Sequence, residues 1–325
     1  MADTLVRDTP EQATQRRRRR GRRGPGATGG DRRRSGPAWL LVGPAVAVLL
    51  LGLGYPVYWQ VVTSLQEYGL AQQFGQPPEF VGLDNYARIF AADDLWAVVV
   101  RSLVFCMVNA LLTVGIGLAL ALLMRAVRTW VRVVLQSCLL LAWAMPMVAA
   151  VTVWRWLFDW RTGVINWLLV RLGFDGYAGH NWLAQPLSFF FVATVIIVWM
   201  SVPFVALSLY AGLTQVPEEV IEAARIDGAS ASQQLRHILV PMVRPVLAIV
   251  LLLQIIWDLR VFAQIRLLQD SGAPVSETNL LGTFIFELGI GRQDFAGAAA
   301  VSIFVLLLTV AVSWPYVRSL MKELA

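Results

Sequence analysis

The sequence predicts an all-α integral membrane protein with about six transmembrane helices, both termini in the cytoplasm, and a cytoplasmic helix-turn-helix between the fourth and fifth spans. Three observations predict this fold class. The chain of 325 residues is 57% hydrophobic and 15% charged, whereas a soluble domain is about half apolar and about a quarter charged. Its apolar residues form runs of membrane-spanning length. One long polar join between two of these runs has the pattern of two short helices.

The N-terminal segment, residues 1–36, is an arginine-rich arm that we expect to be disordered. It carries 11 arginines and four acidic residues, whereas the rest of the chain carries 16 basic and 17 acidic residues. Such a segment buries too little apolar surface to fold by itself. A tail that binds nucleic acid is one interpretation. Because the first apolar run begins directly at Trp39, the arm is better explained as a cytoplasmic topology anchor against anionic lipid, with no nucleic-acid partner.

Six apolar runs follow, each long enough to cross a bilayer. They cover approximately residues 39–64, 96–124, 131–157, 187–212, 246–268 and 296–317. With the arm in the cytoplasm, every other connection that falls on the cytoplasmic side also carries basic residues, which is the usual bias. The extracytoplasmic loops are then residues 65–95, 158–186 and 269–295. Residues 37–325 therefore form one six-span domain.

The chain lacks the sequence motifs that mark common enzyme and metal sites. Lys322 is its only lysine, so it cannot form the phosphate-binding loop G-x-x-x-x-G-K-[ST]. The two histidines, His180 and His237, have no neighbours at metal-ligand spacing. No G-x-S-x-G nucleophile elbow is present. We therefore predict no catalytic residue, no metal site and no cofactor bound by this chain.

Polar residues inside the apolar runs are the candidates for a polar pathway, because a polar group at bilayer depth is costly and is usually functional. In the fifth run, Gln254 and Asp258 share one helix face, and Arg260 and Gln264 share another. The alternative is that Asp258 and Arg260 have purely structural partners on neighbouring helices. The full set of candidate path residues is Asn109, Gln254, Trp257, Asp258, Arg260 and Gln264.

The polar join, residues 214–245, has the signals of two helices and a defined corner. Pro217 suits the first turn of a helix, and the run that follows ends at Asp227-Gly228, where glycine can adopt the left-handed conformation of a helix C-terminus. Ser230 and Gln233 form a capping box that starts a second helix. A plain amphipathic connector at the membrane interface has a similar pattern, so this interpretation remains an alternative.

The segment EAARIDGASASQQLRHILVPMVRP resembles the EAA loop of binding-protein-dependent ABC importer permeases. The family pattern is EAA, then a glycine four residues after the last alanine, then I-x-x-P. The IDGAS form resembles the carbohydrate branch, with its maltose-type permease pairs, and VGLDNYARIF (residues 81–90) is similar to a segment after the first span of the first permease in such pairs. The matching residues of the loop are Glu222, Ala223, Ala224, Asp227, Gly228, Ala229, Ile238 and Pro241.

The resemblance implies a multi-pass permease of a bacterial cell membrane and assigns those loop residues to ATPase coupling. It implies four partners: a second homologous permease in a heterodimer, a cytoplasmic ATPase dimer that holds ATP and Mg, an extracytoplasmic solute-binding protein, and a sugar substrate. The chain departs from the family at VFAQIRLLQDSGAP, where an acid and a Gly-Gly-Pro ending are common. The substrate therefore stays open. The alternatives are a glycerol-phosphate or polyol importer, a secondary transporter, or a membrane scaffold whose loop binds another partner.

Overall fold

The computed structural model describes residues 36–324 and divides the chain into two compact units, Met1–Tyr55 and Pro56–Ala325. The described part of the first unit contains α2 (Gly36–Leu49) and a π-helical turn, η1 (Leu50–Gly54), and it ends at the first residue of α3 (Tyr55–Ser64). The predicted arm falls, apart from Gly36, outside the described residues, so its disorder and its role remain predictions.

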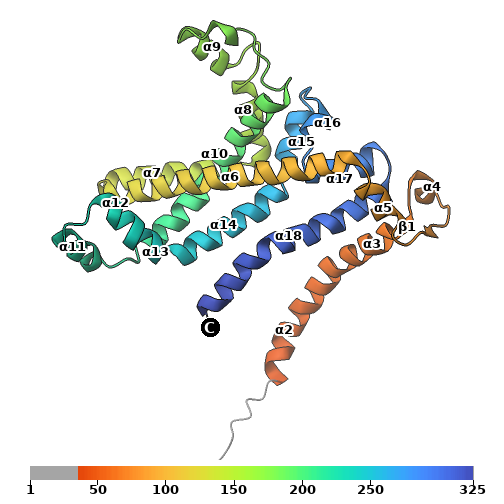
Figure 1. Ribbon diagram of the computed structural model, residues 1–325, viewed down its shortest axis with the longest axis horizontal. Coiled ribbons are helices and arrows are strands. Elements are labelled where there is room, and N and C mark those ends of the chain that lie inside the picture. Colours follow the sequence, from red (N-terminus) through yellow and green to blue (C-terminus); the bar gives the residue numbers. More distant parts are fainter. Residues whose placement is uncertain (1–35, 325) are drawn as a thin grey trace, which may run out of the picture. The chain divides into compact units, whose positions relative to one another are not determined.

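The second unit is built almost entirely from helices (Figure 1). Its long helices are α6 (Asp93–Ala126), α7 (Thr129–Trp143), α10 (Pro186–Leu213), α14 (Arg244–Leu259) and α18 (Phe295–Leu324). The shorter helices and turns are α4 (Leu70–Gln73), α5 (Asp84–Phe90), α8 (Met147–Leu157), α9 (Val164–Arg171), η2 (Asp175–Tyr177), α11 (Glu218–Ile226), α12 (Ala231–Gln234), η3 (Leu235–Leu239), α13 (Val240–Met242), α15 (Ala263–Gln269), α16 (Val275–Thr278), α17 (Leu281–Phe286) and η4 (Glu287–Gly291). Two short strands, β1 (Gln66–Glu67) and β2 (Glu79–Phe80), pair antiparallel.

Five stretches of the described chain are long and apolar enough to cross a membrane, and they match five of the six predicted spans. They are Val42–Ser64, Asp93–Ala126, Pro186–Leu213, Arg244–Gln269 and Phe295–Arg318. In Figure 1, α11 and α12 lie at one end of the second unit, and α5, α16 and α17 lie toward the other. The helix α6 runs between the two ends and packs against both α10 and α14.

The third predicted span, residues 131–157, is not one straight helix. It consists of α7 and α8, which are bent by 98° at a short break. The break falls at Pro146, which lacks the amide hydrogen that a continuous helix needs at that point. Because α7 has only 15 residues and a full span needs about 20, α7 alone is too short for a span, and the bent pair has the form of a broken span or a re-entrant loop.

The fifth span is also interrupted. α14 ends at Leu259 and α15 begins at Ala263, so Arg260 and Gln264 do not share a face of one continuous helix as predicted. By contrast, Gln254 and Asp258 both lie within α14 and are in direct contact, with the Gln254 side-chain amide donating to the Asp258 carboxylate at 2.9 Å.

The helix α5 is tied to the end of the first span by the polar residues of VGLDNYARIF. The buried Asn85 side-chain amide donates to the carbonyls of Ser64 at 3.0 Å and Gln66 at 2.9 Å. The Tyr86 hydroxyl lies 2.8 Å from the Ser64 hydroxyl. Asn85 thus satisfies the Ser64 carbonyl, which the end of α3 leaves without a helical partner, and the Gln66 carbonyl of β1, so that α5 is held against the end of α3.

Asp294 links α5 to the last helix, α18. Its carboxylate accepts the Gly297 amide at 2.8 Å, which caps α18, and it forms an ion pair with Arg88 of α5 at 2.7 Å. Burial by itself raises the pKa of the Asp294 carboxyl. The hydrogen bonds from Arg88 and Gly297 and the nearby charges of Arg88 and Arg292 outweigh that effect, and the pKa lies below its ordinary value.

We expect Asp294→Ala to lower the free energy of unfolding by about 1–2 kcal/mol, because it removes both a helix cap and a partly buried ion pair. Asp294→Asn keeps a cap acceptor and should have a smaller effect. Since folding lowers the pKa of Asp294, its stabilisation is present above the unfolded pKa of about 4 and is lost as the pH falls through the folded pKa.

Thermal denaturation of the detergent-solubilised chain between pH 3 and pH 7 measures this contribution. The difference between wild type and Asp294→Asn should be largest near neutral pH and should shrink in acid. Asp270→Asn is the matched control, because Asp270 pairs with Arg266 on an exposed helix surface and its loss should cost less than about 0.5 kcal/mol. A difference for Asp294→Asn that is constant with pH would contradict the assignment.

Candidate functional site

The predicted corner in the polar join is present, and backbone geometry explains its sequence. α11 begins at Glu218, directly after Pro217, which therefore precedes the first turn instead of lying within it. Gly228 has a φ of +80°, which side-chain-bearing residues adopt at a cost, and its amide donates to the Arg225 carbonyl at 3.0 Å. The corner is thus a defined glycine stop and not a flexible link.

The second helix begins with the predicted capping box. The Ser230 hydroxyl accepts the Gln233 amide, and the Gln233 side-chain oxygen accepts the Ser230 amide at 2.8 Å. After α12 the chain continues through the π-helical turn η3 and then α13. Ile238 is half-buried against a hydrophobic cluster that contains Leu213 and Val243. Pro241 lies exposed in α13. The second half of the join therefore leads directly into α14.

The corner is anchored to the membrane helices on one side only. Ile221 of α11 is buried in a cluster with Leu213 of α10, Ala121 of α6 and Val243 before α14. Glu222 is exposed but lines a pocket with Ile221 and with Arg125 of α6. Elsewhere the corner is open: Ala223, Asp227 and Gly228 are exposed, and Ala224 and Ala229 are half-buried. Ile226 is 86% exposed.

Four of the candidate path residues line one pocket of about 590 Å³ between the end of α7, the middle of α10 and the break between α14 and α15. They are Trp257, Asp258, Arg260 and Gln264. The break that separates α14 from α15 is what lets residues on both sides of it face the same space. The predicted grouping of these residues therefore holds, although the predicted helix face does not.

Aromatic side chains line and flank this pocket. Trp257 contacts Phe204 with ring centroids 5.3 Å apart, and Phe204 stacks on Trp143 at 6.2 Å. Trp257 and Trp143 are both exposed to the pocket space. A pocket with aromatic rings and a few convergent polar groups is typical of a site for a small polar ligand.

Asp258 is the most deeply placed polar group of the pocket, with 3% of its surface exposed. Its neighbour Gln254 is buried behind it and donates one amide group to both carboxylate oxygens at 2.9 Å. Gln254 does not line the pocket; it holds the carboxylate in place. No described basic side chain lies within ion-pair distance of Asp258, so Arg260 is not its salt-bridge partner.

Asn109 is fully buried in α6, and its side-chain amide donates to the Phe105 carbonyl one turn earlier at 2.8 Å. It does not line the pocket. Sequence reasoning missed Trp143 and Ser201, which do line it. In the sequence, Trp143 lies near the middle of the third predicted span. Pro146, three residues later, was the signal for the break between α7 and α8 beside which Trp143 lies.

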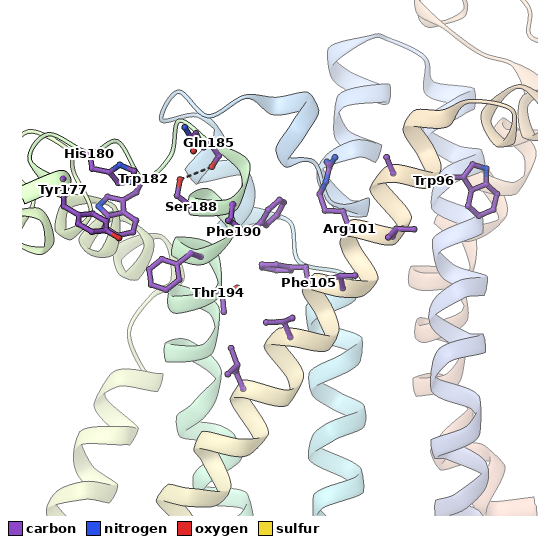
Figure 2. A pocket seen from close by; sticks show the side chains of 18 residues that line it. Trp96, Arg101, Phe105, Tyr177, His180, Trp182, Gln185, Ser188, Phe190 and Thr194 are labelled. Atoms are coloured by element: carbon purple, nitrogen blue, oxygen red, sulfur yellow. Dashed lines mark hydrogen bonds between the residues drawn. The ribbon is translucent and has the colours of Figure 1, made fainter. Parts of the chain in front are cut away.

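A larger hollow of about 1400 Å³ lies between the N-terminal halves of α6 and α10 (Figure 2). Among the residues that line it, Phe105 and Phe190 approach each other, with ring centroids 5.4 Å apart. Its lining is mainly aliphatic and aromatic, with Arg101, Gln185 and Ser188 at the rim. None of the candidate path residues lines it, so its geometry fits an apolar neighbour within the membrane better than a polar substrate.

Residues 112–318 match the family described as the binding-protein-dependent transport system inner membrane component. This range contains the corner, the pocket and α14. The chain belongs to this family. Proteins of this family are membrane-spanning subunits of ABC transporters and not enzymes in themselves.

Two curated relatives match over most of their length. The diacetylchitobiose uptake system permease protein DasB of Streptomyces coelicolor is 38% identical over 92% of this chain and 92% of its own. The trehalose/maltose transport system permease protein MalF of Thermococcus litoralis is 33% identical over 83% of this chain and 90% of its own. The fold resembles a chain of a bacterial ABC transporter that imports the acidic polysaccharide alginate, with a TM-score of 0.75, 21% identity, and coverage of 89% of this chain and 96% of that one.

Proposed function

We propose that this chain is one permease subunit of an ATP-driven importer for a neutral sugar or short oligosaccharide. The pocket beside Trp257 and Asp258 is the proposed substrate site on the translocation path. Its aromatic rings suit the apolar faces of a sugar ring, and the carboxylate of Asp258 with the amide of Gln264 suits its hydroxyl groups. The sugar-transporting relatives support the same substrate class.

The observation that carries the proposal is the direct connection between the corner and the pocket. The corner leads through η3 and α13 into α14, and the far end of α14 carries Trp257 and Asp258. A partner that moves α11 therefore acts on the helix that lines the pocket. The exposed Glu222, Ala223 and Ile226 and the stop at Gly228 are the proposed contact with a separate ATPase.

The proposed assembly has this chain and a second, homologous permease side by side, with an ATPase dimer that holds ATP and Mg on the cytoplasmic face. An extracytoplasmic binding protein delivers the sugar to the opposite face. This places both termini, the arm and the join 214–245 in the cytoplasm, in agreement with the distribution of basic residues. It places residues 65–95, 158–186 and 269–295 outside.

The proposed mechanism is a two-state one. ATP binding closes the ATPase dimer and moves α11, and the rigid corner transmits this movement to α14, which opens the pocket to one side of the membrane or the other. ATP shifts the equilibrium between the two states because it binds one of them better than the other. The permease itself forms no covalent bond with its substrate.

An importer for a glycerol-phosphate, a polyol or an anionic glycoside is the second candidate. A permease of a sulfoquinovosyl glycerol transport system in Agrobacterium fabrum is 30% identical over 86% of this chain. Arg260 and Arg266 could attract an anion, but only Arg260 lines the pocket. Asp258 lines the same pocket, and its oxygens are hydrogen-bond acceptors that suit the hydroxyl groups of a neutral sugar.

Co-expression with the second permease, the ATPase and the binding protein tests the proposal. We expect the permeases and the ATPase to purify together, and proteoliposomes to take up the sugar only with ATP and the loaded binding protein. Uptake driven by a proton or sodium gradient without ATP would instead identify a secondary transporter. Purification of the chain with a different cytoplasmic partner and without an ATPase would identify a scaffold.

A further inference from the structure

The helix α17 supports one wall of the pocket beside Asp258 without lining it. The break between α14 and α15 forms that wall, since Val261 and Phe262 both line the pocket. Gly282, in the first turn of α17, lies against the break from outside the pocket. A Cβ at this position would be 2.9 Å from the Val261 carbonyl oxygen and 3.3 Å from the Cβ of Phe262. Only glycine permits this approach, because a side chain would push the backbone of the wall aside.

A second contact of α17 holds the same wall one turn later. Phe286 lies four residues after Gly282, and residues at this spacing share a helix face. Its ring contacts that of Phe262, with centroids 5.4 Å apart. The guanidinium of Arg266, in α15, lies 5.0 Å from the centre of the Phe286 ring. One face of α17 therefore contacts both the break and the helix that follows it.

The start of α17 is itself fixed to α6, against which it packs. The buried Ser102 hydroxyl accepts the Leu281 amide at 2.9 Å. The Arg101 guanidinium donates to the carbonyls of Asn279 at 3.0 Å and Ser276 at 3.3 Å. The first amides of a helix have no partner within it, so Ser102 satisfies one of them and fixes the point at which α17 begins. The position of the support is thus set by a helix that is not part of the wall.

Asn279 ties the other end of α15 to the same anchor. Its side-chain oxygen accepts the side-chain amide of Gln269, the last residue of α15, at 3.1 Å. Its own amide donates to Glu287, and the Glu287 carboxylate accepts the Arg292 guanidinium at 2.7 Å. Asn279 is 2% exposed and Gln269 3%, and hydrogen bonds in such surroundings hold their partners firmly. Both ends of α15 are therefore held by residues 279–286.

We propose that Gly282 and Asn279 are positioning residues that set the width of the pocket through the break between α14 and α15. The inference rests on the proposed function, which makes this pocket the sugar site. Neither residue lines the pocket, so both act through the backbone of the wall. A binding site is selective when supporting contacts hold its lining residues to within a fraction of an ångström. These two residues therefore help to determine which sugars the pocket accepts.

Gly282→Ala tests the inference in the complete importer, reconstituted in proteoliposomes. The readout is the rate at which N-ethylmaleimide modifies a cysteine introduced by Gln264→Cys, measured by mass spectrometry of the peptide that carries it. The added methyl group pushes the break toward the pocket, so the rate should fall about fivefold or more. Ser102→Ala should act in the opposite direction and raise the rate, because it frees the start of α17 from α6. It also keeps the test decisive if Gly282→Ala fails to assemble.

Gly289→Ala is the matched control. Gly289 is buried in η4, directly after α17, and a Cβ there would lie 3.3 Å from the Cβ of Ala298 in α18. The variant therefore disturbs packing in the same stretch of chain at a contact with a different helix. It should lower thermal stability but change the modification rate less than about twofold. Equal falls in Gly282→Ala and Gly289→Ala would overturn the inference, because they would reflect a general loss of packing.

Sugar selection gives the functional readout, in importers without the introduced cysteine. With labelled maltose and maltotriose at saturating binding protein, Gly282→Ala should reduce uptake of the trisaccharide more than that of the disaccharide. An equal loss of both sugars overturns the inference, as does an unchanged modification rate, and both results leave the proposed function intact. If the wild-type importer takes up no neutral mono-, di- or trisaccharide while Gly282→Ala still slows modification, the proposed function is wrong and the support of the wall by α17 stands.

Discussion

Replacing Gly228 by proline is expected to abolish substrate-stimulated ATP hydrolysis and uptake, at least a tenfold loss, while the protein still inserts into the membrane. Proline holds φ near −65°, whereas Gly228 has a φ of +80°. Proline also lacks the amide hydrogen that bonds to Arg225. The stop between α11 and α12 would be lost, and α11 would point in a different direction from the helix that the ATPase is proposed to contact.

Gly228→Asn is the control for this prediction, because asparagine tolerates the left-handed conformation better than other side chains. We expect it to retain most of the activity. Glu222→Arg tests the same surface without touching the backbone, since Glu222 is exposed on α11. It should release the ATPase on purification and should also abolish stimulation. Normal uptake in both Gly228→Pro and Glu222→Arg would refute the coupling assignment.

The second large effect is expected at the pocket. Asp258→Leu should reduce ATP-dependent uptake at least tenfold while the ATPase still purifies with the permeases. Hydrogen bonds to a charged group contribute about 1.5–3 kcal/mol each, and every 1.4 kcal/mol is about tenfold in affinity. Trp257→Ala should act in the same direction, because it removes the ring that faces the pocket beside Asp258.

Gln254→Leu separates positioning from contact. Gln254 touches Asp258 but does not line the pocket, so its loss should weaken the apparent affinity for sugar by freeing the carboxylate. Gln254→Glu should be more damaging, because it places two carboxylates together. Asn109→Ala is the control: Asn109 is buried elsewhere on α6, and uptake should stay within about twofold. Equal losses in Asn109→Ala and Asp258→Leu would mean that the pocket is not the substrate site.

Several features were predictable from sequence because they depend on local chemistry. The capping box at Ser230 and Gln233, the stop at Gly228 and the contact between Gln254 and Asp258 each involve residues within four positions of one another. Such interactions follow from helix geometry alone. The span boundaries were predictable for a similar reason, since the length of an apolar run is set by the thickness of a bilayer.

Features that depend on bent helices were not predictable in the same way. Hydropathy averages over a window, so residues 131–157 looked like one span although Pro146 divides it into α7 and α8. The same averaging hid the break between Leu259 and Ala263. These two breaks form the pocket: the first brings Trp143 to it, and the second lets Arg260 and Gln264 face the same space as Asp258.

The sequence by itself determined the class of the molecule: a membrane chain with six apolar runs and an EAA corner between its fourth and fifth runs. Composition and local spacing are sufficient for this, because they do not depend on how distant segments meet. Only the tertiary structure decided which polar residues share a pocket, that Asn109 is excluded from it, and that α17 lies against the break between α14 and α15. Those facts depend on packing between helices far apart in the chain, and a helix that is apolar on both faces does not reveal in its sequence which face is buried.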